Sequence, residues 1–264
     1  MRPLVAVRQA TPYDPGFCER SPLFWPLVRA SRAIGEHDVF PSVTALARVF
    51  EREPPVRFVP ASPRRRRRAP VDPGALYDAR IALHREVPTR AGSWHDLMNA
   101  LVWGTFPRAK RALHFRQHRA IAARVPPGVR ALPPTRTREL DTLALLDEGG
   151  VVILTRWPDE ALAALRSRDS GLGLRSFVAT GAGHVVIFGH AIYESLALGC
   201  APAVAAALVL THPPHEGDLV SATDRALACT IDDEGQLRTP DELRRVNVQA
   251  LAPSHFSRSS APPT

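Results

Sequence analysis

Residues 94–110, WHDLMNALVWGTFPRAK, constrain the fold of this chain more than any other segment. Ser93 can accept a hydrogen bond from the amide of Asp96 while the Asp96 carboxylate reaches back, which is the capping-box pattern of a helix start. Pro107 suits the first position of a second helix. Between them, apolar residues recur at the spacing that gives a helix one buried face: Leu97, Met98, Leu101 and Val102. The segment therefore predicts two successive helices, the first of them packed in a core.

Other segments predict a fold with both helices and strands. Residues 140–155, LDTLALLDEGGVVILT, contain two apolar runs about a DEGG turn, the pattern of a β-hairpin whose glycines take positive φ. Residues 175–188 predict a second pair of strands hinged at Gly181–Gly183, and residues 56–59 a short strand. Further helices are expected at 21–35, 42–51, 158–168 and 190–199. The expected class is α/β, with α+β as the alternative: one main domain in which helices pack on central β-hairpins or a small sheet.

Residues 60–75 form the best internal boundary because they combine prolines with the run Arg64–Arg68 and lack any hydrophobic period. This places an N-terminal helical segment at 1–59 and the main α/β domain at 76–251. Residues 252–264 are expected to be a disordered tail.

Charge is concentrated in one place. The net charge is +8, and removing the five arginines of Arg64–Arg68 leaves 8 − 5 = +3. A block of like charge between prolines is typical of a solvated linker, with contact to nucleic acid or anionic lipid as the alternative. Lys110 is the only lysine among 34 basic residues, which raises the question of whether this position needs a compact ammonium group.

The three cysteines, Cys18, Cys200 and Cys229, are scattered and show no metal-binding spacing, which favours a reducing compartment. The first residues lack the apolar core of a signal peptide. The most apolar stretch, 184–210, carries His190 and Glu194, so it is interpreted as buried core and no membrane span is expected. These features together predict a cytoplasmic protein.

The helix at Ser93 carries the first candidate site. His95 and Asn99 are four residues apart and Asp96 and Asn99 three apart, so they form a polar stripe beside Trp94 and the apolar face. Imidazole, carboxylate and carboxamide groups suit metal coordination, proton transfer or substrate binding. Each also has an ordinary structural interpretation, with Asp96 capping the helix and His95 satisfying a core carbonyl.

The sequence GHAIYE carries the second candidate site. His190 and Glu194 stand at i and i+4 on a helix that follows a strand directly, where ligands often bind in α/β folds. A histidine and a carboxylate can hold a divalent ion, or they can simply form an ion pair. Asp141 and Asp147, with the neighbouring Glu148, belong to the expected hairpin and would complete the site if it folds over the first helix.

His114 and His118 are also four residues apart, on the helix expected from Pro107. Because arginines surround them, this helix is interpreted as an exposed basic face rather than a metal site. Such a face could meet phosphate, although it lacks the aromatic residues of a single-strand binding platform.

Four segments resemble a bacterial family catalogued as domain of unknown function 3025. The matching residues are YDARI (77–81), EVPTRAGSWHDLMNALVWGTFPRAKRAL (86–113), LDEGGVV (146–152) and FGHAIYE (188–194). The family has no established activity, so the resemblance implies segment boundaries and no chemistry.

Three functions follow from these residues. The first is a metal-assisted hydrolase acting on an unidentified small molecule, with His95, Asp96, His190 and Glu194 as ligands or acid/base groups. Asn99 would then orient the substrate and Lys110 offset developing negative charge. The second is a binding protein for nucleic acid or another anionic partner, and the third a purely structural polar network. A single site requires that the side chains of His95 and His190 converge.

Overall fold

The structure is a computed structural model that describes residues 12–35, 38–62, 73–125, 135–167, 169–200, 204–211 and 218–251. The predicted tail at 252–264 and most of the predicted linker at 60–75 lie outside these ranges. The division of the chain into segments at that linker therefore stays a prediction.

The described helices contain the following residues: α1 (Val28–Ile34), α2 (Tyr77–His84), α3 (Trp94–Thr105), α4 (Pro107–Ala122), α5 (Arg138–Gly149), α6 (Pro158–Leu165), α7 (Ser170–Ala179), α8 (His190–Ala197) and α9 (Leu219–Asp232). The strands are β1 (Arg57–Pro60), β2 (Glu86–Thr89), β3 (Gly150–Thr155), β4 (Gly183–Ile187), β5 (Ala205–Thr211) and β6 (Arg244–Val246). Helices and strands alternate along the second half of the chain, and the predicted α/β class is confirmed.

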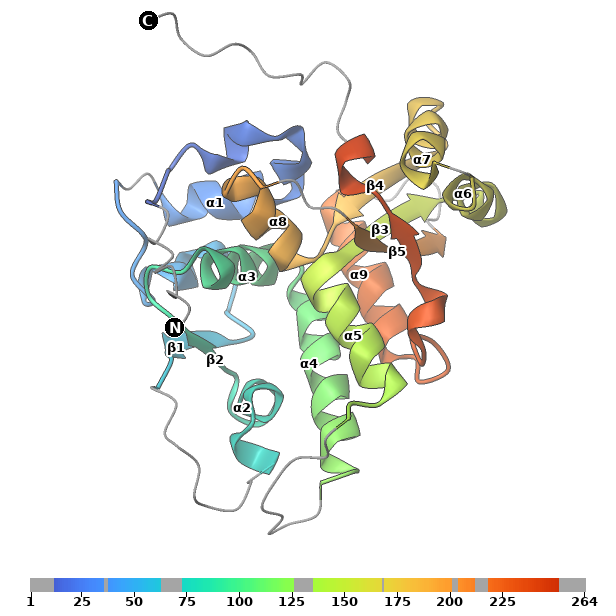
Figure 1. The fold of residues 1–264 in the computed structure, drawn as a ribbon. Coiled ribbons are helices and arrows are strands. Elements are labelled where there is room, and N and C mark those ends of the chain that lie inside the picture. The colour runs from blue at the N-terminus through green and yellow to red at the C-terminus, as the bar shows by residue number, and fades with distance from the viewer. Residues whose placement is uncertain are drawn as a thin grey trace, which may run out of the picture.

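The larger sheet has the strand order β4-β3-β5-β6. β3 and β5 run parallel, and β4 and β6 pair antiparallel with them on the two edges. Every residue of β3 is buried, so both faces of the sheet are covered. α6 and α7 pack against the sheet on one side and α5 on the other (Figure 1). β1 and β2 form a separate two-stranded parallel sheet.

The N-terminal elements pack into the same core as the rest of the chain. Ser21 caps a 3-10 helix, Pro22–Leu27, which becomes the α-helix α1 and ends at Gly35 with φ 92°. The predicted helix is therefore present, and its first part is 3-10 because Pro26 has no N–H to donate. The predicted helix at 42–51 is a 3-10 helix, η3 (Ala45–Val49). Phe24 and Leu27 are fully buried in the cluster that contains α3.

The predicted β-hairpin at 140–155 is wrong. Residues up to Gly149 are helical, because Thr137 caps α5 by accepting from the Leu140 amide at 3.1 Å. Gly150 has φ −71°, so it does not form the expected turn with positive φ. It instead allows the backbone to lie close to the preceding helical turn, since an added Cβ would lie 2.3 Å from the Leu146 carbonyl oxygen. Helix α5 therefore passes directly into β3.

The predicted second pair of strands at 175–188 is half wrong. Asp169 caps α7 through the amides of Gly171 and Leu172, so residues 175–179 are helical and only β4 is a strand. Gly181 does take positive φ, 76°, between the two elements. The helices predicted from Ser93, Pro107, Pro158 and His190 are confirmed.

The region predicted to be core rather than membrane contains β4, α8 and β5. Along the stretches that the structure describes, none of the helices has the length and hydrophobicity needed to cross a membrane.

Two glycines bring α5 and α8 together. The amides of Phe188 and Gly189 both donate to the Gly150 carbonyl, each at 2.9 Å. A Cβ on Gly189 would lie 2.4 Å from the Gly150 nitrogen and 2.5 Å from the Glu148 carbonyl oxygen. The end of α5 and the start of α8 can approach this closely only without a side chain at position 189.

We expect Gly189→Ala to lower the free energy of unfolding by about 1–3 kcal/mol, because the new methyl group forces the two backbones apart. The matched control is Gly149→Ala, whose Cβ would meet no atom within 4 Å and should leave stability unchanged or slightly raised. Urea denaturation of the two variants measures the difference. Equal losses would contradict the assignment of the close contact to Gly189.

Candidate metal centre

His95 and His190 meet in space. His95 lies in the first turn of α3 and His190 is the first residue of α8. Their Nε2 atoms are 3.1 Å apart, and the rings meet edge to face with centroids 4.5 Å apart. The two histidine side chains therefore converge, as a single site requires.

The outer nitrogen of each ring is already occupied. His95 Nδ1 lies 2.9 Å from Glu194 Oε2, and His190 Nδ1 lies 2.8 Å from the main-chain oxygen of Asp147. A carbonyl oxygen only accepts, so His190 Nδ1 carries a proton and the neutral ring keeps its lone pair on Nε2. Contacts of this kind orient metal-ligating histidines in proteins.

Glu148 completes a group of three at the end of α5. Its Oε2 lies 3.3 Å from His190 Nε2, and its side chain is 52% exposed. Among the described residues, His95, Glu148 and His190 form the one group whose potential ligand atoms all lie within 4.8 Å of one another. The group therefore has one wall open to solvent and a buried histidine behind it.

Burial decides the protonation of the two groups nearest this opening. It lowers the pKa of His190 to about 3, with the charges of Lys110 and His95 acting in the same direction and Asp147 opposing. Burial also raises the pKa of Glu148, and the neighbouring Asp147 carboxylate adds to the effect. His190 is consequently neutral at neutral pH, the form in which imidazole binds metals.

Lys110 lies behind the site and does not face its opening. The side chain is fully buried, its Nζ is 2.5 Å from Asp147 Oδ1, and it stands 5.7 Å from the centroid of Trp103. Burial by itself would raise the pKa of Asp147, but the charges of Lys110, His190 and His114 lower it well below its usual value. Lys110 therefore acts on His190 through Asp147, whose carbonyl holds the ring.

The remaining residues of the polar stripe on α3 have local partners. The Asp96 amide donates to the Ser93 hydroxyl, which is one half of the predicted capping box. The Asp96 carboxylate accepts from the amide and guanidinium of Arg90 instead of from the Ser93 amide, so the other half of the capping box is replaced by Arg90. Asn99 is buried and donates to the Tyr77 hydroxyl at 3.2 Å. Asp96 and Asn99 thus sit beside the histidines without reaching the Nε2 atoms.

Two of the supporting residues predicted from the sequence, Trp94 and Asp141, are not part of the group formed by His95, Glu148 and His190. Trp94 is a core residue that packs against Tyr13, Phe17 and Phe40. Asp141 is exposed in the first turn of α5 and lines a groove of about 1090 Å³ that also reaches Glu148. Ala191, the neighbour of His190, lines the same groove, which gives a small molecule a path to the group of three.

The predicted exposed basic face on α4 is wrong for its central residues. His114 is buried, bonds to Asp78 at 2.9 Å and stacks on Trp103. Arg116 is buried as well and bonds to Glu139 and to carbonyls at the end of α9. Because α4 packs between α2, α5 and α9, the side chains of His114 and Arg116 form contacts within the interior.

The sequence places Glu148 in the turn of the expected hairpin, as a carboxylate that would complete the site if the hairpin folds over the first helix. The structure instead brings Glu148 to the histidines from the end of α5. A helical interpretation of 138–149, available from Thr137 and the buried Leu140, Leu143 and Leu146, would have put it at a helix end next to β3.

A fold of this kind, with a histidine and carboxylate cluster where the ends of three helices meet, defines an α/β protein with a candidate metal centre. Residues 56–255 match the family described as "Protein of unknown function (DUF3025)", and the chain belongs to that family. No match was found among curated proteins or among solved structures.

Removing the buried ammonium group tests the support behind His190. Lys110→Met should lower the free energy of unfolding by about 3–5 kcal/mol, because it leaves the Asp147 carboxylate buried without its partner. The double variant Lys110→Met with Asp147→Asn removes both charges and should recover a large part of the loss. Chemical denaturation measures both, and a double variant no more stable than the single one would contradict the pairing.

Proposed function

We propose that this protein is a divalent-metal-dependent hydrolase whose metal ligands are His95 Nε2, His190 Nε2 and a Glu148 oxygen. One observation carries the proposal: three potential ligand atoms lie within 4.8 Å of one another, while the outer nitrogen of each histidine is bound elsewhere. Two histidines, one glutamate and an open fourth position are a known arrangement of catalytic zinc sites.

A metal ion accounts for this arrangement better than a proton does. A proton on His95 Nε2 would satisfy the 3.1 Å contact, since His190 could accept it. It would leave Glu148 Oε2 3.3 Å from a His190 nitrogen that has no hydrogen to offer. A cation between the three atoms is attracted by all of them. In a tetrahedral zinc site, ligand atoms are about 3.3 Å apart, close to the distances from His190 Nε2 to His95 Nε2, 3.1 Å, and to Glu148 Oε2, 3.3 Å.

The surrounding residues then have defined tasks. Glu194 holds His95 through Nδ1, so it orients a ligand, whereas the sequence had suggested that it binds the metal itself. The Asp147 carbonyl holds His190, and Lys110 holds Asp147. Lys110 is too deeply buried to meet a substrate, so the charge it was expected to offset is that of Asp147.

The chemistry proposed is hydrolysis at the groove beside Glu148. A bound zinc ion lowers the pKa of a water molecule toward about 7 and polarises the bond under attack. The groove of about 1090 Å³ is slightly larger than the usual small-molecule site of about 300–1,000 Å³, and its walls between α5, α8 and β6 combine apolar and charged side chains. A small-molecule substrate therefore fits this opening.

Metal analysis tests the first part of the proposal. After removal of metals and dialysis against zinc, we expect the wild-type protein to retain about one zinc ion per chain, and His95→Ala or His190→Ala to retain far less. His84→Ala, which removes an exposed histidine at the end of α2, is the control and should bind as the wild type does. Full zinc retention by His190→Ala would rule out this centre.

The two glutamates are expected to differ. Glu194→Gln should weaken zinc binding by about 10–100-fold while the stoichiometry at saturation is kept, because the glutamate orients a ligand. Glu148→Gln should weaken it further, because a direct ligand loses its charge. A competition titration with a fluorescent zinc chelator measures both affinities, with Asp141→Asn as a control from the same helix. A greater loss of zinc affinity in Glu194→Gln than in Glu148→Gln would contradict this assignment and make Glu194 the direct ligand.

Hydrolysis is tested separately from binding. The zinc-loaded protein should cleave chromogenic esters or phosphate esters, and His190→Ala should not. Stoichiometric zinc without turnover of either class would retain the metal centre and overturn the hydrolase.

A further inference from the structure

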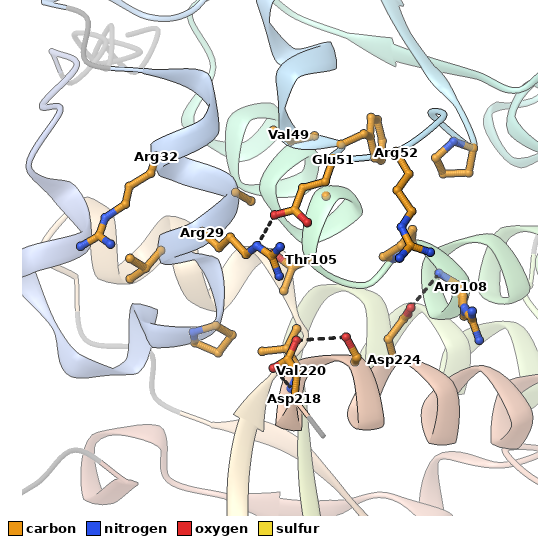
Figure 2. A pocket seen from close by; sticks show the side chains of 18 of the residues that line it. Arg29, Arg32, Val49, Glu51, Arg52, Thr105, Arg108, Asp218, Val220 and Asp224 are labelled. Carbon is orange, nitrogen blue, oxygen red and sulfur yellow. Dashed lines mark hydrogen bonds and ion pairs between the residues drawn. The ribbon is translucent and has the colours of Figure 1, made fainter. Parts of the chain in front are cut away.

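A second hollow, of about 890 Å³, lies away from the histidines (Figure 2). Its walls come from α1, from the residues after η3, from the junction of α3 and α4, and from the start of α9. Segments far apart in the sequence therefore meet around it. Five arginines from four of these elements line it: Arg29, Arg32, Arg52, Arg108 and Arg225.

Most of the carboxylates around this hollow are occupied. Glu51 forms an ion pair with Arg29. Asp218 caps α9 by accepting from the Val220 amide at 3.1 Å and the Ser221 hydroxyl at 3.0 Å. Asp224, 5% exposed, accepts from the amides of Arg108 and Ala109 at the start of α4. Glu53 also lines the hollow, so its walls carry five arginines against four carboxylates, a small excess of positive charge.

Three of the arginines keep their guanidinium groups available. Arg52, Arg108 and Arg225 form no ion pair with a carboxylate anywhere in the described ranges, although Asp224 lies near the latter two. In Figure 2, Arg52 and Arg108 stand on the same side of the hollow, while Arg32 points away from them. Burial raises the pKa of Asp224 to about 6, against the opposing amide bonds and the charges of Arg108 and Arg225, so this carboxylate is protonated at a higher pH than an ordinary aspartate.

The backbone adds to the positive potential. α4 and α9, of 16 and 14 residues, both begin at the hollow, and the N-terminal end of a helix carries partial positive charge. Guanidinium groups beside helix N-termini are a combination that binds phosphate groups.

One wall of the hollow is apolar. Trp25, 41% exposed, lies there with Val49, Phe50 and Val220. An exposed indole offers a flat face for a ring system. The walls are also held rigidly, since a Cβ on Gly104 would lie 2.6 Å from Val49 Cβ, which shows how closely η3 packs on α3.

We propose that this hollow binds a small molecule that carries a phosphate group on an apolar ring system, with Arg52, Arg108 and Arg225 contacting the phosphate and Trp25 the ring. The site is independent of the metal centre and of the proposed hydrolase. Its volume lies within the usual range for small-molecule sites, about 300–1,000 Å³.

Calorimetric titration of the metal-free protein with AMP, adenosine and inorganic phosphate at low salt tests this site. AMP should bind at least about ten-fold more tightly than either of the other two, because only AMP engages both the arginines and the apolar wall. Binding should weaken as salt is raised, since it depends on charge. Absence of AMP binding, or equal binding of adenosine, would overturn the proposal.

Variants locate the binding within the molecule. Arg52→Gln and Arg108→Gln should each weaken AMP binding by about ten-fold, the loss expected when a charge-assisted hydrogen bond is removed. Arg119→Gln is the control, because it removes the charge of another exposed arginine at the other end of α4, outside the hollow. His190→Ala should leave AMP binding unchanged. A loss in Arg119→Gln equal to that in Arg108→Gln would mean nonspecific attraction and would overturn the site.

Discussion

The contact between Gly150 and Gly189 is the constraint on which the candidate site depends. Two amides share the Gly150 carbonyl there, and no side chain separates the backbones. Gly150 follows α5 directly, and Gly189 directly precedes α8. Glu148 and His190 are therefore fixed relative to each other by main-chain geometry, and the only longer-range requirement is that α3 bring His95 to meet them.

The polar groups behind the site form a graded series of charges. Lys110 and Asp147 are ionised and paired in the interior, and the low pKa of Asp147 reflects that pairing. His190, next in line, is held neutral by burial while it donates to the Asp147 carbonyl. Nearest the groove, Glu148 is half exposed. The buried ion pair thus lies deepest, His190 lies in front of it, and Glu148 stands at the surface that a ligand reaches.

The sequence predicted elements correctly where local chemistry defines them. Ser93, Pro107 and Pro158 mark helix starts, and each helix is present. Prediction failed at 140–155, where helix α5 passes directly into a strand buried on both faces. The polar and glycine residues 147–150 at this junction have the composition of a turn, so they were interpreted as the turn of a hairpin. The pairing of positions 95 and 190 is a tertiary contact, and no local pattern could have established it.

The family match begins at residue 56, whereas the N-terminal elements before it pack on the same core. All three atoms of the candidate metal centre lie within the matched residues, but Trp25, Arg29 and Arg52 of the arginine-lined hollow lie before them. The hollow also takes Arg108 and Arg225 from within the matched residues, so it exists only where the N-terminal segment packs on the rest of the chain. The three residues of the candidate metal centre do not require that segment for a ligand atom.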